Sequence, residues 1–131
     1  MDKKKLLIRL TSLIVFISVL NFFAHKFYWY FSIWWSDMPM HFLGGLWLGL
    51  VFFYLFLPEN LSLKLIFKVS LFILIIGIGW EIFEILFINY INQNPFNILD
   101  TISDLFFDLT GGLFAILYFY KKIMFIIKNA I

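Results

Sequence analysis

The residues best suited to chemistry are six acids and one histidine that lie inside long apolar stretches. They form three sets: Asp37 with His41, Glu81 with Glu84, and Asp100 with Asp104 and Asp108. Side chains three or four residues apart share one face of an α-helix. Each set therefore predicts a polar stripe along one helix rather than scattered charges.

Carboxylates gathered in an apolar setting predict one of two states. Either several carboxyls stay protonated through burial and like-charge repulsion, or a cation neutralises them. Oxygen ligands with one imidazole suit a divalent ion such as Mg²⁺, Mn²⁺ or Zn²⁺. The candidate metal ligands are His41, Glu84, Asp104, Asp37, Asp108 and Asp100. The candidate catalytic residues are Glu81, Glu84, His41 and Asp104, and no HExxH or P-loop pattern accompanies them.

Four of these residues also have simpler structural explanations. Asp100 and Asp37 stand where a helix N-cap is expected. His41 would serve equally as a buried hydrogen-bonding side chain. Asp108 would serve equally as a hydrogen bond between two helices. For these positions the sequence leaves both interpretations open.

Glu81 and Glu84 have the weakest structural explanation, because two carboxylates one turn apart in an apolar helix have no Lys or Arg nearby. Depth in the membrane adds to the pattern. At a rise of about 1.5 Å per residue, His41, Glu84 and Asp104 each lie roughly 10–12 Å from the midpoint of their helix, displaced toward the same side of the membrane. We therefore expect the three helices to bring their polar groups to one level.

The composition of the chain indicates the class of protein in which these polar stripes lie. Of the 131 residues, 63% are apolar, 23% aromatic and 14% charged, with no Cys. A soluble domain carries about 25% charged residues, so soluble, disordered and disulfide-stapled classes are excluded. Apolar runs near 6–25, 38–57, 65–90 and 101–120 are each long enough to cross a bilayer. The sequence predicts an all-α integral membrane protein, a single domain over residues 1–131 with four transmembrane helices.

Basic residues predict the orientation of this bundle. Nine of the ten Lys and Arg residues fall on one side of the expected topology, and Lys26 alone falls on the other. The positive-inside rule then places both termini in the cytoplasm of a bacterial-type plasma membrane, with the polar stripes in the outer half. The first run resembles a signal peptide, but Arg9 interrupts it and no small-residue cleavage site follows, so we expect a retained helix.

Two further features indicate contacts with lipid and between helices. Residues 27–35 are mostly aromatic, which predicts a short segment at the membrane interface or, alternatively, a lid that grips lipid. Glycines lie one turn inward of the polar stripes and predict a bundle that is pinched at mid-membrane and open outward. The pairs Gly45/Gly49 and Gly111/Gly112 also offer faces for a homo-oligomer.

Three motifs resemble those of a known family. The segment from Asp37 to Gly45 (Asp-Met-Pro-Met-His-Phe-Leu-Gly-Gly) resembles the D-x-x-x-H-F-x-x-G element of the YjdF-like small bacterial membrane proteins. Glu81-Ile-Phe-Glu84 resembles the E-x-x-E element of that family, and Asp100-Thr-Ile-Ser-Asp104 with the later glycine pair resembles its D-T-x-x-D…G element. The wider VanZ-like group has a related plan. The resemblance implies the same architecture and site but names no reaction.

The favoured function is a small polytopic membrane protein that binds a divalent cation and acts on a lipid or lipid-linked envelope substrate at the outer leaflet. One alternative is a component of proton- or cation-coupled transport. Another is a structural subunit without catalysis, in which the acids only fix helix pairing. A nucleic-acid partner is not expected, because the basic residues act as topology signals.

Overall fold

The protein is described by a computed structural model that covers residues 2–89, 91 and 96–130. Its helices are α1 (Lys3–Lys26), α2 (Trp29–Ser32), α3 (Asp37–Phe56), α4 (Leu63–Phe83), the π-helix η1 (Glu84–Asn89) and α6 (Ile98–Ala130). No strand occurs within those ranges. The predicted all-α class is confirmed.

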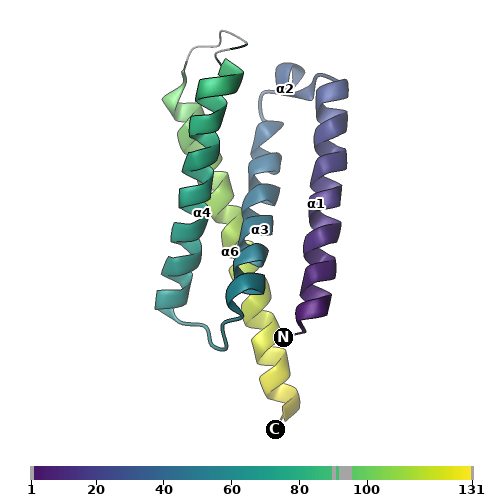
Figure 1. Cartoon of the computed structure of the whole chain (residues 1–131), viewed down its shortest axis with the longest axis vertical. Helices are drawn as coiled ribbons and strands as arrows, with labels where there is room; N and C mark the ends of the chain where they lie inside the picture. The colour runs from purple at the N-terminus through teal and green to yellow at the C-terminus, as the bar shows by residue number, and fades with distance from the viewer. Residues whose placement is uncertain (1, 90, 92–95, 131) are drawn as a thin grey trace.

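Four helical stretches in this part of the chain are long and apolar enough to cross a membrane: Lys3–Lys26, Asp37–Phe56, Leu63–Phe87 and Ile98–Ile126. They run side by side as a bundle, with both chain termini at the same end (Figure 1). We refer to this as the terminus end, and to the opposite end, where α2 lies, as the α2 end. An even number of crossings requires the termini to share a side.

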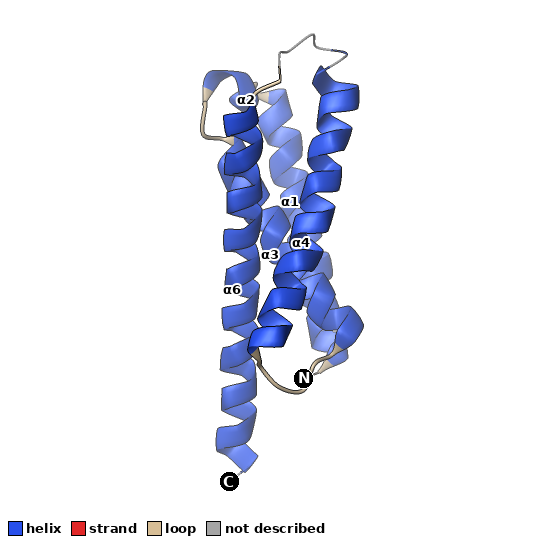
Figure 2. Ribbon diagram, turned by 90° about the vertical axis from the view of Figure 1, so that its left-hand side faces the viewer, coloured by secondary structure: helices blue, strands red, loops and turns tan. Residues whose placement is uncertain are grey.

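The last helix is longer than the sequence predicts. It continues to Ala130, past the expected end at residue 120, and projects beyond the other helices at the terminus end (Figure 2). Lys121, Lys122 and Lys128 lie in this extension. Lysine ends an apolar span but is a good helix former, so the helix outlasts the span.

The starts of two other helices follow from their caps. The Asp2 side chain accepts hydrogen bonds from the backbone N–H groups of Lys4 and Lys5, so α1 begins at Lys3 rather than at residue 6. The Ser62 hydroxyl accepts a hydrogen bond from the N–H of Leu65 at 3.1 Å, and α4 begins at Leu63. The expected end of this span, residue 90, lies outside the described residues.

Helix α3 occupies the centre of the bundle, because it contacts α1, α4 and α6. Toward the terminus end its side chains meet those of α4 and α6 in an apolar core. The rings of Phe53 and Phe119 stack with centroids 4.3 Å apart, and Val69 and Ile73 of α4 are buried beside them. This core fixes α3 and α6 against each other below the polar stripes.

Glycines allow α3 and α6 to touch through their backbones. A Cβ atom on Gly45 would collide with the backbone carbonyl of Asp108, and one on Gly111 would collide with a carbonyl of α3. Gly49 and Gly112 are buried along the same seam. The predicted close approach of two helices is therefore present within one chain. The glycine faces that the sequence suggested for self-association are buried in this contact between α3 and α6.

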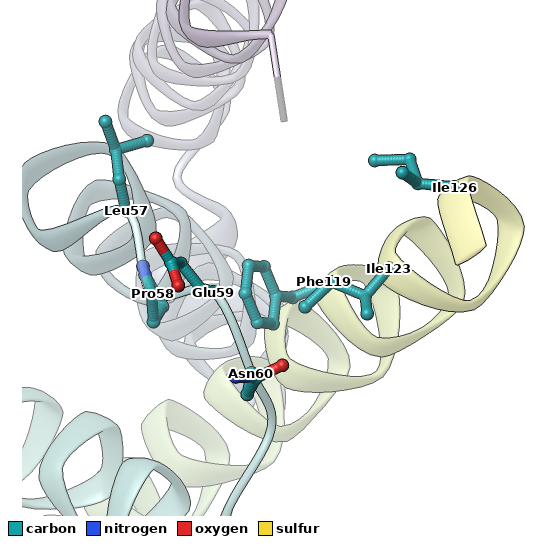
Figure 3. Close-up of a pocket in the computed structure, with 7 residues that line it drawn as sticks. All are labelled: Leu57, Pro58, Glu59, Asn60, Phe119, Ile123 and Ile126. Carbon is teal, nitrogen blue, oxygen red and sulfur yellow. The ribbon is translucent and has the colours of Figure 1, made fainter. Parts of the chain in front are cut away.

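A cavity of about 330 Å³ lies at the terminus end (Figure 3). It is lined by Leu57, Pro58, Glu59, Asn60, Phe119, Ile123 and Ile126. The cavity is therefore formed by the α3–α4 connection and the last part of α6. It holds none of the acids or histidines that the sequence singles out, so the candidate site lies elsewhere.

Candidate functional site

The polar stripes of α3, α4 and α6 meet at the α2 end of the bundle. Among the described residues, four polar or charged side chains are buried, and all four belong to these stripes: His41, Glu81, Asp104 and Asp108. Two overlapping groups have ligand atoms within 4.8 Å of one another: Asp37, His41 and Asp104, and then His41, Glu81 and Glu84. His41 is common to both groups and is the centre of the site.

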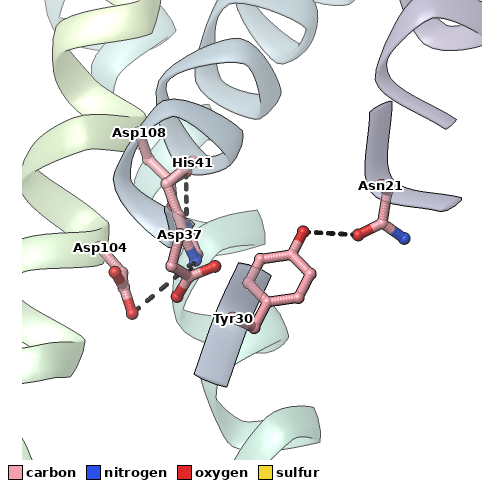
Figure 4. Close-up of polar contacts among 6 residues, drawn as sticks. All are labelled: Asn21, Tyr30, Asp37, His41, Asp104 and Asp108. Carbon is pink, nitrogen blue, oxygen red and sulfur yellow. Dashed lines mark hydrogen bonds and ion pairs between the residues drawn. The ribbon is translucent and has the colours of Figure 1, made fainter. Parts of the chain in front are cut away.

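The two ring nitrogens of His41 have different surroundings (Figure 4). Nδ1 lies 3.2 Å from Oδ1 of Asp108, within hydrogen-bond distance. Nε2 lies 3.6 Å from Oδ2 of Asp37 and 3.7 Å from Oδ2 of Asp104. Because a carboxylate accepts, Nδ1 donates to Asp108, and Nε2 faces the other two carboxylates.

The spacing around Nε2 is too wide for ordinary hydrogen bonds and close to that of metal ligands. Nitrogen–oxygen hydrogen bonds have lengths of about 2.7–3.2 Å. Two ligands bonded at about 2.0–2.2 Å to one tetrahedral or octahedral ion lie roughly 3–3.5 Å apart. A shift of a few tenths of an ångström would therefore bring the oxygens of Asp37 and Asp104 each to a ligand's distance from Nε2 of His41.

Asp108 lies behind His41 and is held by close helix packing. A Cβ atom on Gly77 of α4 would lie 2.8 Å from Oδ2 of Asp108, so the glycine leaves room for that carboxylate. In metal sites, a carboxylate that accepts from the second nitrogen of a ligating histidine fixes its tautomer and orientation. Asp108 occupies that position.

Glu81 contributes a buried oxygen without a partner. Its side chain lies within α4 and is only 5% exposed. Within the part of the chain that the structure describes, Oε1 has no hydrogen-bond partner. A buried polar atom without a partner is costly. The Glu81 carboxylate therefore has an unused acceptor beside His41.

Glu84 stands where the helix changes its winding. The π-helix η1 begins at this residue, and its backbone N–H contacts the carbonyls of both Trp80 and Glu81. Short π-helical turns are uncommon and frequently occur at functional sites. The change of winding starts at the residue that joins Glu81 and His41 in the second group.

The charges of the site do not balance. Five carboxyls surround one imidazole: Asp37, Glu81, Glu84, Asp104 and Asp108. A protonated imidazole offsets a single negative charge, and the base nearest in sequence, Lys26, is exposed at the end of α1. The site therefore holds protons on several carboxyls or takes up a cation, the two states that the sequence predicts.

One predicted ligand stays apart, and of the two interpretations left open for Asp100 and Asp37 the structure does not have the helix N-cap. Asp100 is exposed and belongs to neither group of described residues. The start of α6 is capped by Asn97, whose Oδ1 accepts from the N–H of Leu99 at 3.1 Å, because Asp100 already lies in the first turn. Asp37 likewise lies inside the first turn of α3, one residue after the N-cap Ser36. Its carboxylate is free to face His41.

Two residues near the site were not predicted from the sequence to have a role there. The Tyr30 hydroxyl of α2 donates to Oδ1 of Asn21 of α1 at 2.6 Å, and Figure 4 shows the Tyr30 ring beside Asp37. The sequence places Tyr30 in an aromatic interfacial segment and assigns no role to Asn21. The available signal is the amide itself, because a polar side chain in an apolar helix requires a partner.

Comparison with known proteins adds the family. No curated protein and no solved structure matches the chain. A family model described as a predicted membrane protein family, DUF2238, matches residues 3–123. The match spans α1 to α6 and includes every residue of the site. This chain therefore belongs to the DUF2238 family of predicted membrane proteins.

Proposed function

We propose that the protein binds one divalent cation at the α2 end and uses it on a lipid or lipid-linked envelope substrate. The observation that carries the proposal is the buried Oε1 of Glu81, which has no partner among the described residues, together with His41, whose Nε2 faces two further carboxylates. His41, Asp37 and Asp104 would hold the ion. Asp108 would orient His41 from behind.

A cation explains three features together. It offsets the excess of carboxylates, occupies the space between Nε2 and the oxygens of Asp37 and Asp104, and gives Oε1 of Glu81 a partner. Protonated carboxyls would explain the charge balance but not the other two features. Oxygen ligands with one nitrogen favour Mg²⁺, Mn²⁺ or Zn²⁺.

The catalytic roles follow from which side chains bind the ion and which remain free. The bound ion would supply Lewis-acid polarisation of a substrate oxygen. Glu81 and Glu84 come from α4 and η1 and form the second group with His41, whereas Asp37 and Asp104 come from α3 and α6. A carboxylate in that place can accept or donate a proton during bond cleavage. We assign the general acid–base role to Glu84, because Oε1 of Glu81 would face the ion.

A membrane substrate is supported by the position of the site. The site lies at one end of the candidate spans, and the side chain of Asp37 is 39% exposed there. The neighbouring aromatic segment exposes Phe31, Trp34 and Trp35, and such rings favour the level of lipid head groups. With both termini in the cytoplasm of a bacterial plasma membrane, this end would face outward.

The transport alternative receives less support. Toward the terminus end, the buried side chains of the described residues are apolar, among them Ile73, Ala115 and Phe119. A proton or cation pathway through the chain would need polar groups there. A site that is polar at one end and closed by an apolar core favours binding and chemistry from one side.

The motif order also supports a finer family assignment. We propose that the chain groups with the YjdF-like proteins within the wider VanZ-like group. The acids and the histidine of the three motifs, apart from Asp100, are the residues that meet around His41. This assignment predicts that the shared motif residues of that group form the same cluster.

Metal analysis tests the cation. The purified protein in detergent is loaded with Mn²⁺, Zn²⁺ or Mg²⁺, and the bound metal is counted per chain. We expect about one ion in the wild-type protein and loss of at least about tenfold in affinity for His41→Ala and Glu81→Gln. The matched control is Asp100→Asn, because Asp100 is an exposed acid of α6 outside the site. Absence of binding, or equal binding by all variants, would refute the cation site.

Turnover of lipid tests the activity. The protein is reconstituted in vesicles of bacterial lipid extract, and head-group products are followed by mass spectrometry with and without added metal. We expect a metal-dependent product that disappears in Glu84→Gln while the bound metal remains. Metal binding without any metal-dependent product would reduce the function to cation binding.

A further inference from the structure

Tyr30 is fixed beside the entrance of the site by contacts with α1. Its hydroxyl donates to Oδ1 of Asn21 at 2.6 Å, and its ring lies against that of His25 with centroids 4.9 Å apart. Figure 4 shows the ring next to Asp37 with the hydroxyl turned toward Asn21. The tyrosine therefore stands between α1 and the half-exposed ligand of the site.

The charges of the site act on Tyr30. Burial raises the pKa of Tyr30 to about 12, and the negative charges of Asp37 and Glu84 act in the same direction. These two acids belong to different groups around His41, so Tyr30 is near both. A phenol that remains protonated keeps its single hydrogen for Asn21 and presents its ring to the site.

The turn that carries Tyr30 is held firmly. Tyr28 adopts a left-handed backbone conformation with φ 56°, which is unfavourable for a residue other than glycine. Its carbonyl accepts from the N–H groups of Phe31 and Ser32 and from the Ser32 hydroxyl. The Ser36 hydroxyl donates to the carbonyl of Trp29 at 3.0 Å. These bonds keep Tyr30 in place despite the strain.

The exposure of the ligands shows where a solute enters. His41, Glu81 and Asp104 are buried, whereas the Asp37 side chain is 39% exposed. Glu84 is also only partly buried, so a solute reaches His41 past Asp37 or Glu84, the two acids whose charges act on Tyr30. We propose that Tyr30, held by Asn21, is the residue that controls access to the site.

Where the solute that enters is a cation, this inference rests on the proposed function. Tyr30 would slow entry and release of the ion and leave its equilibrium affinity nearly unchanged, because the tyrosine is not among the ligands. Breaking the Asn21–Tyr30 bond would free the ring to move away from Asp37. Tyr30 is thus a positioning residue, and its effect is on rates.

Chemical modification of His41 tests access without relying on a metal. Diethyl pyrocarbonate reacts with accessible imidazoles, and mass spectrometry separates modified His41 from modified His25. In detergent, the variants Tyr30→Phe and Asn21→Ala are expected to react at His41 about 2- to 12-fold faster, the range that one lost hydrogen bond produces. The double variant is expected to react no faster than Tyr30→Phe, because both changes break one bond.

Two controls separate access from general loosening of the fold. Tyr28→Phe changes an exposed tyrosine of the same turn and is expected to leave the His41 rate unchanged. Trp47→Phe removes a different link to α1, the bond from Nε1 to the carbonyl of Leu10, and is also expected to leave that rate unchanged. Equal rates for Tyr30→Phe and Tyr28→Phe would overturn the inference, and so would equal acceleration by Trp47→Phe.

Release of bound Mn²⁺ provides the second measurement. With saturated protein and excess chelator, Tyr30→Phe is expected to release the ion faster than the wild-type protein at unchanged affinity. Unchanged release together with unchanged modification contradicts the access role and leaves the cation site standing. Faster modification of His41 in a protein that binds no ion supports the access role and refutes the cation site.

Discussion

The contact between α3 and α6 and the contact between α1 and α3 are built in different ways. In the first, glycines such as Gly45 and Gly111 remove the side chains, so that the two backbones touch. In the second, α1 buries few residues and is held by separate polar links. The indole N–H of Trp47 donates to the carbonyl of Leu10 at 3.1 Å, and next to this contact Tyr30 of α2 donates to Asn21 of α1.

The difference assigns distinct tasks to the two regions. Direct backbone contact tolerates little displacement, so it fixes the rotation and depth of both helices. A site with ligands from α3 and α6 requires such fixed positions. Individual hydrogen bonds contribute about 1 kcal/mol each and can open one at a time. The glycine seam therefore positions the site, and the Tyr30–Asn21 link to α1 controls what reaches it.

The largest expected effect comes from breaking the seam. In Gly45→Ala the new Cβ meets the backbone of Asp108, so α3 and α6 must separate. We expect a loss of about 3 kcal/mol or more in the free energy of unfolding, at the upper end of overpacking costs, together with loss of cation binding. Denaturant titration in mixed micelles measures the stability.

The adjacent glycine is the matched control for this change. Nothing lies within 4 Å of a Cβ atom on Gly44. Gly44→Ala is therefore expected to be neutral or to stabilise the helix by up to about 1 kcal/mol. Similar destabilisation by the two substitutions would show that the seam is not the rigid half of the molecule.

A smaller effect is expected from the residue that joins the seam to the site. Asp108→Asn keeps the volume but removes the carboxylate that accepts from Nδ1 of His41. We expect divalent-cation affinity to fall about 10- to 100-fold, the usual range for losing such a partner. Titration calorimetry measures this, with Asp100→Asn as the control. Unchanged affinity would remove Asp108 from the site and leave it a purely structural role.

Removing the hydrogen bond between α3 and α1 is expected to have a smaller effect on stability. Trp47→Phe removes the donor to Leu10 and should lower stability by about 1 kcal/mol. Amide hydrogen exchange should increase in α1 and remain unchanged in α3 and α6. Trp34→Phe, at a position 82% exposed, serves as the control. Faster exchange throughout the bundle would show that α1 is as integral as the seam.

The smallest effect concerns pH. Because the pKa of Tyr30 is raised to about 12, its neutral form is favoured in the folded state, and the resulting stability is complete below pH 10 and lost as pH rises toward 12. Tyrosinate absorbance should show a late-titrating component. Tyr30→Phe should remove that component and Tyr28→Phe should retain it. Titration of all tyrosines together near pH 10 would contradict the buried position.

Much of the site was predictable because helix periodicity is local. Asp37 and His41 share a face in any α-helix, and so do Asp104 and Asp108. Span lengths also relate the depths of residues on different helices, which is why Glu81 and Glu84 were expected near His41. The same reasoning grouped Asp100 with the site, because spacing along a helix does not show where the cluster ends.

Other features depend on contacts that no local pattern contains. The sequence by itself determined an all-α membrane class, the approximate spans and the polar faces, since these follow from hydropathy and the helical repeat. The tertiary structure decided that Nδ1 of His41 meets Asp108, that Asp100 stays outside and that Tyr30 binds Asn21. Those outcomes depend on how each helix is rotated about its axis, and that rotation is set by side-chain packing and by the glycine seam between α3 and α6.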